Sequence, residues 1–193
     1  MLAQLRPAFV LVGLCTVLFG MLYPALVTGV GQLAFPRQAN GSLLVAGDTV
    51  RGSRLLGQAF SEPGHLWSRP SATGPTPYDG SASSGSNLGP GNPALHDAVR
   101  ARVARLRATG IDAPIPVDLL TSSGSGLDPH VSPAAAELQV PRIARARGLD
   151  PDAVRRVLAR HTEGRLLGVF GEPRVNVLGV NLELESGANA PDR

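Results

Sequence analysis

Residues 8–30 contain no charged side chain, and no other part of the 193-residue chain has an apolar run of comparable length. As an α-helix this run would be about 35 Å long, which is enough to cross a hydrocarbon core of about 30 Å. A cleaved signal peptide is the main alternative. Its apolar region is only about 7 to 15 residues long, and no convincing small-residue cleavage site follows at a suitable distance. Residues 1–36 are therefore predicted to be an uncleaved transmembrane anchor with its flanks.

One side of the predicted anchor is lined by small residues and a proline. Gly13, Thr16, Gly20 and Pro24 recur at spacings of three and four, which places them on the same face of a helix. Small residues on a membrane helix usually mark where another backbone packs closely. The pattern predicts that these four residues bind a membrane partner. The alternative is that glycine is simply common in membrane helices.

The basic residues restrict the chemistry of the chain. All 18 are arginine, so a Walker A loop and a Schiff-base lysine are both excluded. The formal net charge of +3, with arginines scattered among acidic residues, does not predict nucleic-acid binding. The single cysteine, Cys15, lies in the apolar run, and the histidines lack the spacing of metal motifs. We therefore expect no disulfide and no metal site.

The residue types of a hydrolytic triad are present in one short segment. Ser123, Ser125, Asp128 and His130 are too close in sequence to converge on one proton-relay line, and no Gly-x-Ser-x-Gly elbow is present. We predict no catalytic site.

Residues 37–185 are predicted to form one soluble α+β domain, and residues 186–193 a disordered tail. Residues 40–60 mix short apolar runs with glycine and aspartate, which is typical of short strands. Residues 166–170 and 174–185 are also predicted to be strands, the second because apolar and polar side chains alternate. Helices are interspersed with these strands without regular alternation, which favours α+β over a doubly wound sheet.

Three helix starts are predicted where a capping residue precedes a proline, which suits the first helical position. They are Asn92-Pro93, Ser132-Pro133 and Asp150-Pro151. Pro141 is expected to break or restart the second helix, because it lacks an N–H. In the first helix, Arg100, Arg105 and Arg107 are expected to face solvent.

Residues 61–93 contain few aliphatic side chains and many serines and glycines, a composition typical of a flexible linker. The same segment contains Trp67, Tyr78 and several X-Pro turns, which favour a long ordered surface loop instead. We predict that Trp67, Arg69 and Tyr78 hold this loop in one conformation and bind a partner, because aromatic residues and arginine are the usual anchors of protein interfaces.

Many ordered motifs of the chain resemble the KdpC family, the C subunit of the bacterial potassium-transporting P-type ATPase. They are Tyr23-Pro24 in a single N-terminal span, Gly57-Gln58-x-Phe60, Trp67 with Arg69-Pro70-Ser71-Ala72, Tyr78-Asp79, Ser86-Asn87-Leu88, Thr121-x-Ser123-Gly124-Ser125-Gly126-Leu127-Asp128-Pro129-His130, Gln139, residues 142–148 and Val175-Asn176-Val177-Leu178. The resemblance covers nearly the whole chain.

The resemblance implies an accessory subunit of a high-affinity potassium pump in the bacterial cytoplasmic membrane. Its implied partners are a channel-like potassium-binding subunit and a P-type subunit that hydrolyses ATP. The residues agree with an accessory role, since a chain without lysine cannot contain the phosphorylation loop Asp-Lys-Thr-Gly-Thr. The charges that flank the span, Arg6 and Arg37, do not settle its orientation. The family suggests that the soluble domain is extracytoplasmic.

The family has also been described as a catalytic chaperone that raises the pump's affinity for ATP. In this chain that role implies a nucleotide site at Ser123, Gly124, Ser125, Gly126 and Gln139. The alternative is that the glycines only permit tight turns. Because no lysine can hold phosphates and Asp128 would repel them, we expect any ATP binding to be weak.

A second class of function stays open from the sequence. The chain would then be a membrane-anchored extracytoplasmic binding module that presents residues 67–87 to a small ligand or a protein, without a pump.

Overall fold

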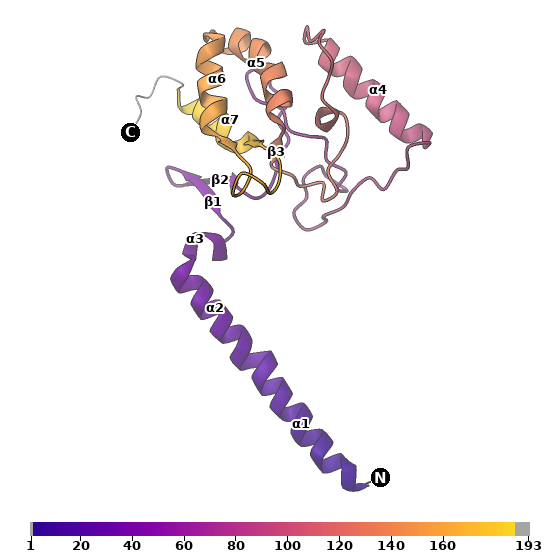
Figure 1. Cartoon of the computed structure of the whole chain (residues 1–193), viewed down its shortest axis with the longest axis vertical. Coiled ribbons are helices and arrows are strands. Elements are labelled where there is room, and N and C mark those ends of the chain that lie inside the picture. The colour runs from indigo at the N-terminus through magenta and orange to yellow at the C-terminus, as the bar shows by residue number, and fades with distance from the viewer. Residues whose placement is uncertain (1, 188–193) are drawn as a thin grey trace. The chain divides into compact units, whose positions relative to one another are not determined.

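The computed structural model describes residues 2–187, which fall into two compact units that divide between Arg51 and Gly52. Figure 1 labels most of their helices and strands. The first unit thus extends past the anchor predicted for residues 1–36. The predicted tail, residues 186–193, lies outside the described residues apart from Ser186 and Gly187.

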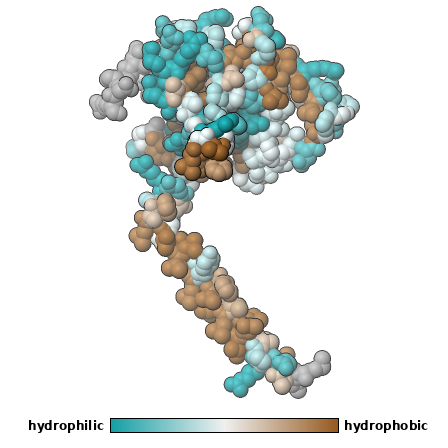
Figure 2. All heavy atoms as spheres, in the orientation of Figure 1, coloured by the Kyte–Doolittle hydropathy of each residue, from teal (hydrophilic) through white to brown (hydrophobic). Residues whose placement is uncertain are grey.

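The first unit is dominated by one long helix. After a short 3-10 turn, η1 (Leu2–Gln4), it consists of α1 (Leu5–Val17), η2 (Leu18–Leu22) and α2 (Tyr23–Ala34). These 30 residues have a mean hydropathy of 2.2 in their most apolar window, none of which is buried. Apolar side chains cover the visible face of this helix in Figure 2. The predicted span is confirmed as a helix long and apolar enough to cross a membrane.

The segment η2 is a π-helical turn, in which the Tyr23 N–H donates to the carbonyl of Leu18. It ends at Leu22, two residues before Pro24. In a regular α-helix the ring of Pro24 would clash with the carbonyl of Gly20, four residues earlier, and no N–H would donate to that carbonyl. A wider turn before a proline is one way in which helices accommodate it.

A short helix, α3 (Pro36–Ala39), and a two-stranded sheet of β1 (Leu43–Ala46) and β2 (Thr49–Ser53) follow. The turn between the strands contains Gly47 with φ of +60°, a conformation that glycine adopts without strain. Short strands in residues 40–60 are thus confirmed.

The second unit contains the three helices whose starts were predicted. They are α4 (Pro93–Arg107), α5 (Pro133–Arg147) and α6 (Pro151–Arg160). The side chains of Asn92, Ser132 and Asp150 accept hydrogen bonds from the backbone N–H groups of Ala94, Ala135 and Asp152. The capping patterns are therefore confirmed at all three positions.

The expectation that Pro141 breaks or restarts its helix is wrong. Helix α5 continues through Pro141 to Arg147. Pro141 is exposed, and the carbonyl that loses its partner belongs to Glu137, which is also exposed. Water can therefore replace the missing hydrogen bond, and burial of the other face holds the helix together.

The prediction of a strand over residues 174–185 is also wrong. Only β5 (Arg174–Asn176) is a strand, and α7 (Val177–Ser186) follows at once. The Asn176 side chain caps this helix by accepting from the Gly179 N–H at 2.9 Å. Val177, Val180, Asn181 and Leu184 are buried, at spacings of three and four. The apparent alternation concealed this helical stripe.

A small antiparallel sheet in the order β3-β5-β4 joins β3 (His130–Val131), β5 and β4 (Thr162–Glu163). His130 pairs with Asn176, and Thr162 pairs with Val175. Residues 166–170 are not a strand of this sheet: Leu166 and Phe170 form an isolated bridge that closes a turn.

The hydrophobic core of the second unit lies among α5, α6, α7 and β5, with Leu66 and Trp67 of the preceding loop. Figure 1 shows α4 set apart from α5 and α6. One apolar N-terminal helix followed by helices and small sheets confirms the α+β prediction.

Candidate binding site

The loop between β2 and α4, residues 54–92, contains no described helix or strand but enters the core. Leu66 has no exposed surface, and Trp67 is only 8% exposed. A segment that supplies core side chains is an ordered loop and not a linker.

Two amide side chains hold this loop as a neighbouring strand would. Gln139 of α5 accepts from the Trp67 N–H at 2.8 Å, and its Nε2 donates to the Trp67 carbonyl at 3.2 Å. Asn181 of α7 bonds the N–H and the carbonyl of Leu66 in the same way, at 2.7 Å and 3.0 Å. Both amides are almost completely buried. Consecutive backbone groups of the loop are therefore satisfied inside the core.

Arg142 connects the same loop to α5. Its guanidinium donates to the Pro63 carbonyl, to the His65 carbonyl and to Gln139 Oε1, and it stacks over the Trp67 ring at 4.0 Å. Burial, with a smaller contribution from the nearby charge of Arg105, lowers the pKa of Arg142 to about 10. Arg142 therefore remains a cation at neutral pH.

Arg69 and Tyr78 are joined at the next part of the loop. Arg69 forms an ion pair with Asp128 at 2.9 Å, and the Tyr78 hydroxyl donates to the Arg69 carbonyl. Burial raises the pKa of Tyr78. Burial also tends to raise the pKa of Asp128, but hydrogen bonds from His130 and Arg69 outweigh it and lower that pKa. The carboxylate of Asp128 is thus ionised and committed to holding the loop.

The segment Ser123, Gly124, Ser125 and Gly126 forms a turn that packs on residues 71–85. The Ser125 carbonyl accepts from the Ser84 N–H at 2.9 Å, and the Gly126 carbonyl accepts from the Ser71 hydroxyl at 2.7 Å. Gly126 has φ of +67°, and a Cβ there would lie 2.5 Å from the Ser84 carbonyl oxygen. The glycine is required by backbone conformation and close packing.

The predicted nucleotide residues therefore have separate surroundings. The Ser123–Gly126 turn contacts residues 71–85, whereas Gln139 is buried against Trp67 and Arg142. The predicted interface residues behave differently, because Trp67, Arg69 and Tyr78 all line one pocket. On the anchor, Gly13, Thr16, Gly20 and Pro24 are exposed, and a Cβ on Gly13 would meet no atom within 4 Å.

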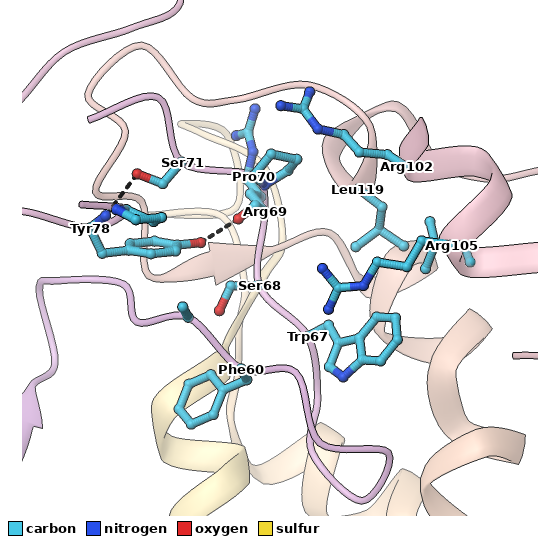
Figure 3. Close-up of a pocket in the computed structure, with 13 residues that line it drawn as sticks. Phe60, Trp67, Ser68, Arg69, Pro70, Ser71, Tyr78, Arg102, Arg105 and Leu119 are labelled. Atoms are coloured by element: carbon cyan, nitrogen blue, oxygen red, sulfur yellow. Dashed lines mark hydrogen bonds between the residues drawn. The ribbon is translucent and has the colours of Figure 1, made fainter. Parts of the chain in front are cut away.

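The pocket has a volume of about 260 Å³ and lies between the long loop and α4 (Figure 3). Phe60, Trp67 and Tyr78 of the loop line it, with Leu106 of α4 and Leu119 of η3 (Val117–Leu119). Arg102 and Arg105 extend into it from α4, and Arg105 stacks over the Trp67 ring at 4.4 Å.

Arg100, Arg105 and Arg107 are exposed, as expected, but the guanidinium of Arg105 also lies on the Trp67 ring. No sequence pattern predicted a role for Arg102 or Asn181, and Arg142 stood out only as the first residue of the 142–148 motif of the family resemblance. The one local signal for Asn181 and Gln139 is a polar residue within a buried helical stripe.

Comparison with known proteins decides the family. Residues 5–186 match the family model described as "KdpC: K+-transporting ATPase, c chain". The chain belongs to the KdpC family. Similar members include the potassium-transporting ATPase KdpC subunits of Sorangium cellulosum, 62% identical over 96% of this chain and 98% of the relative, and of Variovorax paradoxus, 56% identical over 96% and 97%. The KdpC subunit of Herpetosiphon aurantiacus is 54% identical over 93% and 94%.

Proposed function

We propose that this chain is the accessory subunit of an ATP-driven potassium uptake pump and that it acts by binding the other subunits. The observation that carries this proposal is the match to KdpC subunits, one of which is 62% identical over 96% of this chain. Its partners are a channel-like potassium-binding subunit and a P-type subunit that hydrolyses ATP. It is anchored in the bacterial cytoplasmic membrane by α1 to α2, with the second unit extracytoplasmic.

The surface of the second unit supports a role in assembly. The turn of residues 166–170 exposes Leu166, Leu167, Val169 and Phe170 by 64 to 83%. Its ends are joined by two backbone hydrogen bonds between Leu166 and Phe170, at 2.9 and 3.0 Å. A fixed turn that exposes four large apolar side chains has the chemistry of a protein contact.

The contacts of the Ser-Gly turn argue for an effect on ATP hydrolysis through assembly rather than through a nucleotide held by this chain. The Ser123 hydroxyl accepts from the Gly126 N–H at 3.0 Å, and the Ser125 hydroxyl accepts from the Leu127 N–H at 3.1 Å. Two backbone N–H groups that could bind a phosphate, those of Gly126 and Leu127, are thus used within the turn. Weak ATP binding remains the second candidate, and it rests on the family description alone.

Purification of the tagged full-length chain in mild detergent tests this proposal. The chain should bring two large membrane proteins with it, and Gly13→Leu with Gly20→Leu should reduce their recovery, because added bulk prevents close backbone approach. Leu11→Val with Leu18→Val is the matched control and should not. A chain that purifies alone would instead support an independent binding module, and equal behaviour of both pairs would contradict the assigned face.

A further inference from the structure

The pocket between the long loop and α4 is lined by cations without acids. Among the described residues that line it are three arginines, Arg69, Arg102 and Arg105, and no aspartate or glutamate. We call it the arginine pocket. Figure 3 shows Arg102 and Arg105 reaching from α4 towards the loop, with the Trp67 ring below Arg105. Such a site attracts anions and repels cations.

The three positive charges are not equally neutralised. Arg69 is paired with Asp128. Arg102 donates to a neutral acceptor, the Leu120 carbonyl, at 2.6 Å, and burial lowers its pKa. Arg105 has no hydrogen bond or ion pair to any described residue and only stacks on Trp67. Arg142, which also stacks over the Trp67 ring, at 4.0 Å, adds a further buried cation whose pKa is lowered in part by Arg105. The site therefore carries excess positive charge.

The geometry favours a carboxylate over a phosphate dianion. Arg102 and Arg105 lie in the second half of α4, near the helix C-terminus, where the helix dipole is negative and no free backbone N–H groups converge. Stacking on the indole occupies one face of the Arg105 guanidinium and leaves its edge donors to bind a planar carboxylate through two hydrogen bonds. Phe60 and Tyr78 supply an apolar wall for the carbon chain of the ligand.

From this charge complementarity we infer that the arginine pocket receives a glutamate or aspartate side chain from another subunit of the pump. This inference rests on the proposed function for the identity of the partner. The carboxylate accepts hydrogen bonds from the Arg105 guanidinium and neutralises the excess positive charge around Trp67. Loss of that contact weakens the complex without altering the fold of the free chain.

The chemistry of the pocket can be measured on the full-length chain alone in detergent. Trp67 is the single tryptophan of the chain, so its fluorescence reports directly on the pocket. Glutarate, added at constant ionic strength, should change the emission saturably. Arg105→Gln should weaken this response by about tenfold or more, as expected for loss of a charge-assisted hydrogen bond. Arg100→Gln, a control on the exposed side of α4 where Arg100 pairs with Asp97, should keep it. No saturable response, or equal responses of the two variants, would overturn the inference.

The identity of the occupant is tested in the assembled pump. Arg105→Glu should lower the recovery of the partner subunits about tenfold or more relative to Arg100→Glu, and acidic-to-basic substitutions in a partner subunit should restore it. Arg105→Lys is a control for misfolding. It keeps the positive charge, so it should give a recovery of the partner subunits between those of Arg105→Glu and the unmodified chain. Glutarate binding with unchanged recovery would identify a site for a free carboxylate and overturn the partner assignment. Failure of the unmodified chain to recover partners would contradict the proposed function instead.

Discussion

Replacement of Gln139 by alanine should destabilise the second unit strongly. The side chain has no exposed surface and bonds both the N–H and the carbonyl of Trp67. Without it, these two backbone groups are buried with no partner. The Arg142 guanidinium also loses one of its acceptors.

The magnitude follows from the groups left unpaired. Each buried polar group that loses its partner costs about 1–3 kcal/mol. Two such groups, with the cavity left by the removed side chain, lower the free energy of unfolding by about 3–5 kcal/mol. For a unit of this size the melting temperature should fall by roughly 10 °C.

Thermal unfolding of the full-length chain in detergent, followed by Trp67 fluorescence, measures this change. The matched control is Glu137→Ala, two residues earlier on the exposed face of α5, where Glu137 pairs with Arg155. An exposed ion pair contributes little, so the melting temperature of this control should hardly move. If Gln139→Ala melts at the same temperature as Glu137→Ala, the hydrogen bonds between Gln139 and the Trp67 backbone do not stabilise the fold as proposed. If it keeps its stability but binds ATP less well, Gln139 is a nucleotide residue.

Three further changes test other parts of the structure. Gly126→Ala should lower the melting temperature by several degrees, because its Cβ would meet the Ser84 carbonyl, whereas Gly124→Ala, with no atom within 4 Å, should not. The pKa of Asp128 is lowered in the folded chain, so the ionised carboxylate stabilises the fold fully above about pH 4 and less as the pH falls further. Melting curves of Asp128→Asn should therefore show a smaller loss of stability below that pH than those of the unmodified chain. Leu167→Ser, at the exposed turn, should leave the melting curve unchanged but reduce co-purification of partner subunits.

Local patterns were enough to predict the elements that depend on local chemistry. The span follows from an uncharged run, and the starts of α4, α5 and α6 follow from a capping residue and a proline. The same local view failed at α7. There, alternating apolar and polar residues in part of the segment concealed a helix capped by Asn176.

The candidate site could be predicted only in part, because its geometry depends on contacts between distant residues. Trp67, Arg69 and Tyr78 were predicted to belong together, and they line one pocket. No local pattern shows that Gln139, 72 residues away, bonds the Trp67 backbone, or that Arg105 of a separate helix stacks on its ring. The family resemblance groups Gln139 with residues 123–126 as one nucleotide site. That grouping does not imply that these residues contact one another in the structure.

We propose that the pump requires this chain as a non-catalytic subunit. Potassium-stimulated ATP hydrolysis by membranes containing the other pump subunits, measured with and without the chain, tests it most directly. We expect hydrolysis to require the chain and to return on its co-expression, while membranes containing the chain alone hydrolyse no ATP in response to potassium. Full potassium-stimulated hydrolysis without the chain, or hydrolysis by the chain alone, would contradict this proposal.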